Sequence, residues 1–170
     1  WSMGGFVAQI FAVSYPEMVE KLVLYASNCG GEEAFPPDQK TIDILENPTA
    51  SPMDLLGTLF PEEWMAAHPR PWEAMPQGGA PINGEAIALQ YKAIQQWLAP
   101  GGGTGQKLRD LKAPTLIICG FEDKVVPPEN SSMLASRIAD SRLVCLENCG
   151  HGVMYQSPEL FSREIIDFLG

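Results

Sequence analysis

The sequence opens with Trp1-Ser2-Met3-Gly4-Gly5, which places a serine and two glycines at the start of an apolar, helix-like segment. Residues 1–4 match the last four positions of the pattern G-x-S-x-G, whose first glycine would precede Trp1. In this pattern the serine occupies a tight turn between a strand and a helix, and small neighbours let the two backbones approach closely. We therefore expect a helix from about Met3, with the hydroxyl of Ser2 exposed at its start. We refer to residues 1–5 as the elbow.

The composition is typical of one folded domain with a strong negative charge. The chain has 170 residues, of which 45% are hydrophobic and 9% are aromatic, enough for a packed core. Its 21 acidic and 11 basic residues give a net charge of −10, which disfavours nucleic acids and anionic membranes as partners. No apolar run approaches the roughly 18 residues that span a bilayer. We expect a cytoplasmic protein without membrane insertion.

The four cysteines, Cys29, Cys119, Cys145 and Cys149, contain no C-x-x-C pair. Cys119 lies within an apolar, strand-like run, so we expect free thiols that are mostly buried. Cys145 and Cys149 are near His151 in the sequence, but zinc sites use tighter paired spacing and usually four ligands. We therefore expect no metal site.

Two parts of the chain alternate between apolar strands and helices. The strands are expected at residues 21–26, 115–119 and 142–146, and the helices at 3–15, 128–139 and 158–169. The strand segments are continuous apolar runs, which are typical of parallel strands covered on both faces. Ser157 is placed to cap the last helix. The pattern predicts an α/β fold with three parallel strands and flanking helices.

Residues 32–105 have a different pattern, in which short amphipathic helices are separated by proline-rich connections. Helices are expected at residues 41–45, 53–60, 62–67 and 84–98, with no strand between them. A helical block inserted between two strands of an α/β sheet is typical of a lid over a binding site. We therefore divide the chain into the elbow helix with the first strand (1–31), a helical lid (32–105) and a C-terminal α/β core (106–170).

Several apolar residues are candidates for contact with a substrate. They are Leu56, Phe60, Trp64 and Trp97 in the lid, together with Trp1 and Val125 outside it. For any one lid residue, packing between helices is the commoner explanation. His68 is interpreted as a surface residue of the lid.

Two polar loops follow strands of the C-terminal part. Residues 120–128 (GFEDKVVPP) follow the second strand, and residues 148–152 (NCGHG) follow the third. Proteins of the α/β class place functional groups at the carboxyl ends of their strands. Ser2, Asp123 and His151 therefore occur in the chain order serine, acid, histidine.

In these three motifs and their order, the chain resembles the C-terminal half of a protein with the α/β-hydrolase fold, of the lidded serine esterase and lactonase type. Motifs at residues 1–30 and 111–170 carry the resemblance, and residues 32–105 share only the helical character. The resemblance implies that the strands preceding the elbow are absent from this sequence. An N-terminal segment or a second chain would then complete the sheet.

The resemblance also implies a role for each candidate residue. Ser2 would be the nucleophile, and His151 would be the base that removes its proton. Asp123 would orient His151, and the backbone N–H of Met3 would donate to the oxyanion that forms during acyl transfer. Glu122 is the alternative to Asp123. Glu32 and Glu33, which follow the first strand, are more remote alternatives.

The implied activity is hydrolysis of carboxylic esters, thioesters or lactones through an acyl-enzyme intermediate, without a cofactor. The substrate would be a small acyl compound bound beneath the lid. Hydrolysis of carbon–carbon bonds and perhydrolysis remain open, because they would use the same three residues. A non-catalytic module that binds a ligand in the lidded pocket is the alternative from a different class.

Overall fold

The computed structural model describes residues 1–76 and 83–170, and its centre is a parallel sheet of three strands. The strands are β1 (Leu22–Tyr25), β2 (Thr115–Gly120) and β3 (Ser141–Leu146), in the order β1-β2-β3. All of β2 is buried, which explains why its sequence is a continuous apolar run. The predicted α/β fold with three parallel strands is confirmed.

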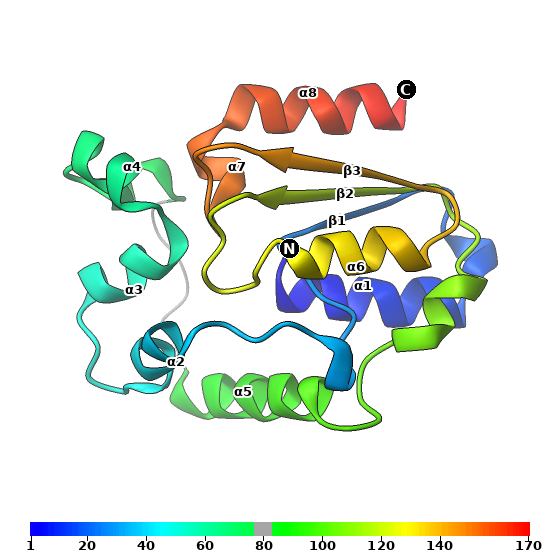
Figure 1. The fold of residues 1–170 in the computed structure, drawn as a ribbon, viewed down its shortest axis with the longest axis horizontal. Coiled ribbons are helices and arrows are strands. Elements are labelled where there is room, and N and C mark those ends of the chain that lie inside the picture. The colour runs from blue at the N-terminus through cyan, green and yellow to red at the C-terminus, as the bar shows by residue number, and fades with distance from the viewer. Residues whose placement is uncertain (77–82) are drawn as a thin grey trace.

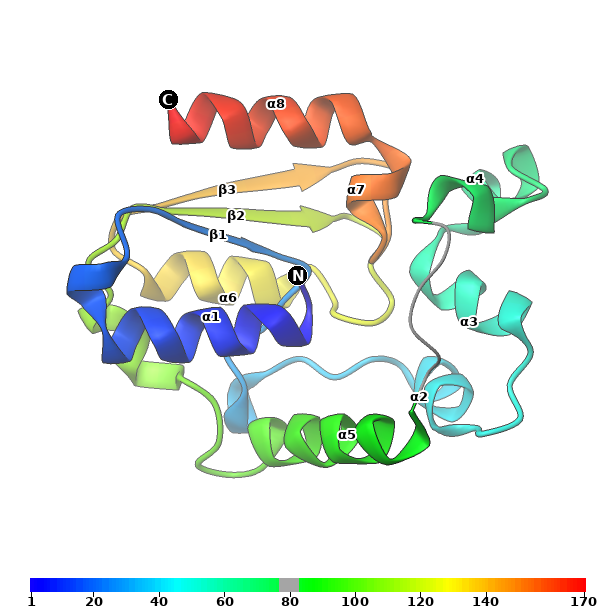
Figure 2. The same ribbon diagram turned by 180° about the vertical axis from the view of Figure 1, so that it is seen from behind.

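Helices cover both faces of the sheet, as Figures 1 and 2 show. The helices α1 (Met3–Ser14) and α6 (Glu129–Arg137) lie on one face, and α8 (Pro158–Leu169) lies on the other, preceded by the single turn α7 (Val153–Gln156). Because successive residues of a strand point to opposite faces, Ile117 joins one core with Leu134, whereas Leu116 and Ile118 join a second core with Phe161.

Most helix boundaries fall within two residues of the expected ones, and the differences have local causes. The helix α6 ends at Arg137 because Ile138 adopts an extended conformation. Ser157 precedes α8, but its side chain makes no capping hydrogen bond, since its Oγ contacts the Sγ of Cys149 at 3.3 Å. The short helix α7 was not predicted, because a single turn carries no periodicity. Short 3-10 turns connect the core elements at Pro16–Met18 and Gly105–Asp110.

A helical insertion (residues 32–105) separates β1 from β2, and residues 77–82 of it lie outside the described part of the chain. Its elements are the helices α2 (Gln39–Glu46), α3 (Pro52–Leu59), α4 (Glu62–Ala67) and α5 (Gly84–Leu98), with 3-10 turns at Gly31–Glu33 and Pro71–Ala74. Figure 1 shows α2, α3 and α4 beyond the carboxyl ends of the strands and α5 beside α1. The insertion therefore approaches the edge of the sheet at which the predicted functional loops begin.

Side-chain caps mark the starts of α2, α3 and α5, whereas α4 follows Pro61 without a side-chain cap. The Asp38 carboxylate accepts a hydrogen bond from the Thr41 N–H at 2.7 Å, and Asn83 caps α5 in the same way. Ser51 and Asp54 form a reciprocal capping box at the start of α3. Each cap satisfies backbone donors that the first turn of a helix leaves unpaired.

Trp97 anchors the end of α5 to the core. Its ring stacks on Phe6 of α1, with 4.6 Å between centroids, and its Nε1 donates to the Asn28 side chain at 2.8 Å. The backbone carbonyl of Asn28 accepts a hydrogen bond from the side-chain amide of Gln9. The Oε1 of that same amide accepts from the Thr104 hydroxyl. Trp97 is buried among these groups, so the structure gives it a packing role between the insertion and the core.

In the described part of the chain both edge strands of the sheet, β1 and β3, pair with β2 alone, and one face of α1 is exposed. Within residues 1–76 and 83–170, β1 pairs with β2 and with no other strand. The helix α1 exposes Val7 by 64% and Ile10 by 51%. That a further segment or chain completes the sheet stays a prediction. Over the same described residues, no helix has the length and apolar character needed to cross a membrane.

Candidate active site

Ser2 occupies a strained turn at the start of α1. Its φ of 51° and ψ of −127° lie outside the regions that residues other than glycine prefer, at a cost of roughly 1–3 kcal/mol. Three hydrogen bonds hold the turn: the Ser2 N–H donates to the Tyr25 carbonyl at 3.1 Å, and the Ser2 carbonyl accepts from Gly5 N–H and Ser27 Oγ. The elbow is therefore attached to the end of β1 in a fixed, unusual conformation.

The two glycines after Met3 differ in what they contribute. A Cβ on Gly5 would lie 2.7 Å from the Cβ of Ser27, closer than side chains tolerate, whereas a Cβ on Gly4 would meet nothing within 4 Å. Among the described residues, close approach between α1 and the end of β1 thus requires a glycine at position 5. The matching position of the sequence pattern, Gly4, is exposed.

Asp123 and His151 form a buried pair at the carboxyl ends of β2 and β3. The His151 Nδ1 lies 2.9 Å from Asp123 Oδ2 and 3.1 Å from Oδ1, and the two side chains are 4% and 0% exposed. Asp123 Oδ1 also accepts hydrogen bonds from the N–H groups of Val125 and Val126 at 2.9 and 2.8 Å. An ionised carboxylate accepts only, so Nδ1 carries the proton and Nε2 of a neutral His151 is left as an acceptor.

Of the acidic residues considered from the sequence, only Asp123 contacts His151. The Glu122 side chain is exposed, and its backbone N–H donates to the Cys149 carbonyl at 2.8 Å. Glu33 is ion-paired with Arg137, and the hydrogen bond that Arg137 donates within this pair lowers the pKa of the Glu33 carboxyl. Glu32 is exposed in the same short turn.

Two loops are joined by backbone contacts that extend the pairing of β2 with β3. We call residues 120–128 the acid loop and residues 148–152 the histidine loop. The Phe121 N–H donates to the Leu146 carbonyl at 2.9 Å, and Glu122 N–H reaches the Cys149 carbonyl. A Cβ on Gly120 would overlap the backbone of Cys149 and Gly150. This close contact between backbones places Asp123 against His151.

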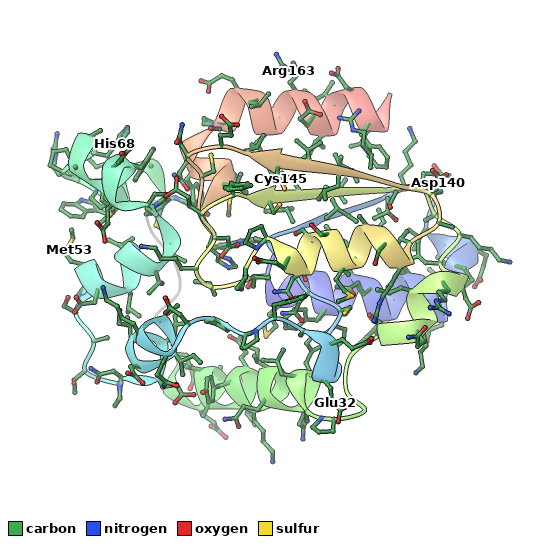
Figure 3. All side chains as sticks on the ribbon, in the orientation of Figure 1. Glu32, Met53, His68, Asp140, Cys145 and Arg163 are labelled. Atoms are coloured by element: carbon green, nitrogen blue, oxygen red, sulfur yellow. The ribbon has the colours of Figure 1, made fainter. Side chains whose placement is uncertain are left out.

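The insertion packs directly on the histidine loop. The Gly152 N–H donates to the Leu59 carbonyl at 3.0 Å, and a Cβ on Gly152 would lie 2.5 Å from the Phe60 ring. Phe60 is buried and stacks on Trp64, which stacks in turn on the exposed His68. Figure 3 shows His68 on the outer part of the insertion, in agreement with its interpretation as a surface residue.

Trp1, the first residue of the elbow, also contacts the histidine loop. Its Nε1 donates to the His151 carbonyl at 3.1 Å, and its ring lies 5.4 Å from the imidazole ring between centroids. Within the described residues Ser2 Oγ makes no hydrogen bond to His151, so the elbow meets the histidine loop through Trp1.

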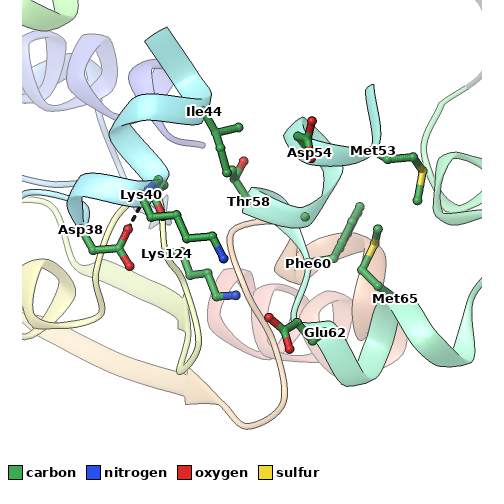
Figure 4. Close-up of a pocket in the computed structure, with 12 residues that line it drawn as sticks. Asp38, Lys40, Ile44, Met53, Asp54, Thr58, Phe60, Glu62, Met65 and Lys124 are labelled. Carbon is green, nitrogen blue, oxygen red and sulfur yellow. Dashed lines mark hydrogen bonds between the residues drawn. The ribbon is translucent and has the colours of Figure 1, made fainter. Parts of the chain in front are cut away.

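A cavity of about 350 Å³ lies between the insertion and the acid loop, and Figure 4 shows its lining. Phe60 is the candidate for substrate contact that lines it, and the other five candidates do not. Apolar side chains of Ile44, Met53 and Met65 face it together with the charged side chains of Asp38, Lys40, Asp54, Glu62 and Lys124. The apolar pattern of the insertion did not predict this charged half, because charged residues of amphipathic helices ordinarily face solvent.

Potential metal ligands do not gather at this site. In the part of the chain that the structure describes, no group of three or more His, Cys, Asp and Glu side chains converges so as to hold a metal ion.

Substitution of the two elbow glycines should have opposite effects on stability. Gly5→Ala would force the new methyl group against Ser27, and we expect the free energy of unfolding to fall by about 1–3 kcal/mol. Gly4→Ala adds a better helix former at an open position and should raise it by about 0.5–1 kcal/mol. Denaturant unfolding of both variants measures the difference, and equal effects would contradict the packing described for Gly5.

Comparison with known proteins agrees with this architecture. A sequence model described as the alpha/beta hydrolase family matches residues 1–164. The chain is 28% identical over 180 residues to a 2-hydroxy-6-oxo-6-phenylhexa-2,4-dienoate hydrolase of Comamonas testosteroni. It is 30% identical over 175 residues to a 2-hydroxy-6-oxononadienedioate/2-hydroxy-6-oxononatrienedioate hydrolase of Burkholderia vietnamiensis. Each alignment covers 99% of this chain and 60% of the relative, so the chain spans about three fifths of their length.

Solved structures show the same fold. A hydrolase from Pseudomonas aeruginosa PA01 superimposes with a TM-score of 0.75 at 26% identity, covering 99% of this chain and 62% of that structure. A thermophilic esterase from Thermogutta terrifontis gives a TM-score of 0.75 at 24% identity, with the same coverage. With the family model matching nearly the whole chain, the protein belongs to the alpha/beta hydrolase family.

Proposed function

We propose that the protein is a serine hydrolase in which Ser2, His151 and Asp123 act together. The observation that carries this proposal is the buried hydrogen bond between His151 Nδ1 and the Asp123 carboxylate. That contact leaves Nε2 as a proton acceptor at the carboxyl edge of the sheet. Ser2 lies at the same edge, because its N–H bonds to Tyr25 at the end of β1. A strained serine on a turn at a helix start is the second supporting observation.

In the proposed reaction His151 Nε2 takes the proton of Ser2 Oγ while the oxygen attacks the acyl carbon of the substrate. The Met3 N–H, at the start of α1, would donate to the oxyanion of the tetrahedral intermediate. His151 then gives the proton to the leaving group, which leaves an acyl group on Ser2. Water attacks this acyl-enzyme by the same proton transfers in reverse, and Asp123 stabilises the imidazolium in both halves.

The proposed substrates are small carboxylic esters, thioesters or lactones. We propose that the helical insertion acts as a lid and that the cavity beside the acid loop receives part of the substrate. Phe60 is the best-supported contact, because it lines this cavity and packs on Gly152, the neighbour of His151. Contacts from Trp1, Leu56, Trp64 and Val125 stay predictions, and burial against Asn28 and Phe6 leaves Trp97 a weaker candidate.

Covalent labelling tests the nucleophile directly. In the protein expressed from its full reading frame, a fluorophosphonate probe should modify Ser2, and Ser2→Ala should abolish both the labelling and esterase activity. Ser136→Ala is a matched control, because Ser136 lies exposed on α6 and its hydroxyl, within residues 1–76 and 83–170, donates to the Met133 carbonyl alone. Labelling that persists in Ser2→Ala, or no labelling of the folded protein, would refute the assignment.

The two neighbouring acids allow a test of the orienting residue. Asp123→Asn removes the charge that faces His151 and should lower kcat by about 10⁴-fold, because the amide favours the wrong imidazole tautomer. Glu122→Gln is the control, since the exposed Glu122 side chain makes no contact with His151, and it should leave kcat within about twofold. Steady-state assays with an activated ester measure both. A larger loss for Glu122→Gln would reverse the assignment.

Hydrolysis of a carbon–carbon bond is the second candidate function. It is favoured by the two relatives named above, whose names specify hydrolysis of unsaturated 2-hydroxy-6-oxo carboxylates. Parallel measurement of kcat/KM for p-nitrophenyl butyrate and for 2-hydroxy-6-oxo-6-phenylhexa-2,4-dienoate separates the two reactions. We expect the ester to give the higher value. A higher value for the dienoate would favour the second candidate, and saturable binding without turnover of either would favour a non-catalytic module.

A further inference from the structure

Two cysteines face one another across the pair of strands that carries the acid and histidine loops. Cys119 of β2 and Cys145 of β3 are register partners, and their Sγ atoms lie 2.7 Å apart. Neighbouring strands run about 4.7–4.9 Å apart, and a disulfide spans Cα separations of about 4.4–6.8 Å. Both thiols are free in this structure, and no change of register is needed to join them.

The two thiols differ in access to solvent. Cys145 is exposed and Cys119 is buried, and Figure 3 locates Cys145 on β3, at the end opposite Asp140. Burial raises the pKa of the Cys119 thiol, and its hydrogen bond with Cys145 raises that pKa further. An oxidant from solution therefore reacts first with Cys145. The Cys119 thiol stays protonated and in contact with the Cys145 sulfur.

The remaining two cysteines are shielded. Cys29 and Cys149 are buried, and burial raises the pKa of both thiols. Cys29 lies beside the Arg137 guanidinium at 3.7 Å, and Cys149 contacts Ser157 Oγ. Of the four cysteines, Cys145 is the exposed one, so oxidation from solution should be specific to the pair that includes it.

We propose that Cys119 and Cys145 form an oxidation site at which a hydroperoxide produces a disulfide between β2 and β3. The Cys145 thiolate attacks the O–O bond of hydrogen peroxide, which forms an S–O bond and releases hydroxide. Cys119 gives its proton to that hydroxide, and its sulfur then attacks the Cys145 sulfur, which breaks the S–O bond and releases the second hydroxide. With the proton first released by Cys145, two thiols and one peroxide give one disulfide and two waters.

The bond would join the two strands whose loops carry Asp123 and His151. Cys119 lies four positions before Asp123, and Cys145 lies six positions before His151. The disulfide therefore strengthens the strand pairing on which the contact between the two loops depends. This inference does not rest on the proposed hydrolase activity, since it concerns thiol chemistry alone.

Mass spectrometry of the oxidised protein tests the site. The folded protein is treated with hydrogen peroxide and quenched, and its intact mass is measured. It is then unfolded, alkylated and digested with a protease that cleaves after glutamate, because a cut after Glu147 separates Cys145 from Cys149. We expect a loss of about 2 Da, two fewer alkylated cysteines, and a linked pair of peptides that contain Cys119 and Cys145 and separate on reduction. Cys149→Ser should leave this result unchanged, and Cys145→Ser should abolish it.

Three results would overturn the proposal. Cys145 could accumulate as sulfenic or sulfinic acid while Cys119 still reacts with the alkylating agent. Cys145 could join Cys149 or a second molecule instead of Cys119. All four thiols could also stay reactive after prolonged treatment. The unmodified sequence alone decides among these outcomes, so a variant that fails to fold does not affect the test.

Discussion

The candidate site depends on the continuation of the β2–β3 pairing beyond the ends of the strands. The Phe121 N–H donates to Leu146 at the end of β3, and the Glu122 N–H donates to Cys149 in the histidine loop. These bonds bring the acid and histidine loops together, and Gly120 makes room for that approach. A carboxylate as deeply buried as Asp123 is costly to desolvate unless it is fully hydrogen-bonded. Two backbone N–H groups and the imidazole meet that requirement, so the loop geometry and the charge support each other.

The histidine loop is also contacted by two distant parts of the chain, the elbow and the insertion. Trp1 contacts it from the elbow, and Leu59 and Phe60 contact it from the insertion. Because Gly152 has no side chain, the Phe60 ring can pack on the backbone next to His151. The insertion proposed as a lid therefore packs on the backbone next to the residue proposed as the general base.

The contact between Asp123 and His151 was implied by the resemblance that three motifs and their order carry. The sequence itself was sufficient to predict the parallel strands and the helices of the insertion, because apolar runs and amphipathic spacing are local signals. It could not predict that Trp97 donates to Asn28, 69 residues away, or that Cys119 lies opposite Cys145. Those contacts depend on strand register and on how the insertion docks, which no single segment encodes. The sequence also suggested Ser157 as a helix cap, whereas tertiary contact directs its hydroxyl to Cys149.

The proposed mechanism requires a covalent intermediate on Ser2, beside the buried Asp123–His151 pair. Its most direct test is rapid-quench mass spectrometry of the full-length protein mixed with an ester that deacylates slowly. We expect an acyl adduct to appear on the peptide containing Ser2 and to decay at the rate of product formation. Steady turnover without that adduct, or with an adduct on another residue, would contradict it.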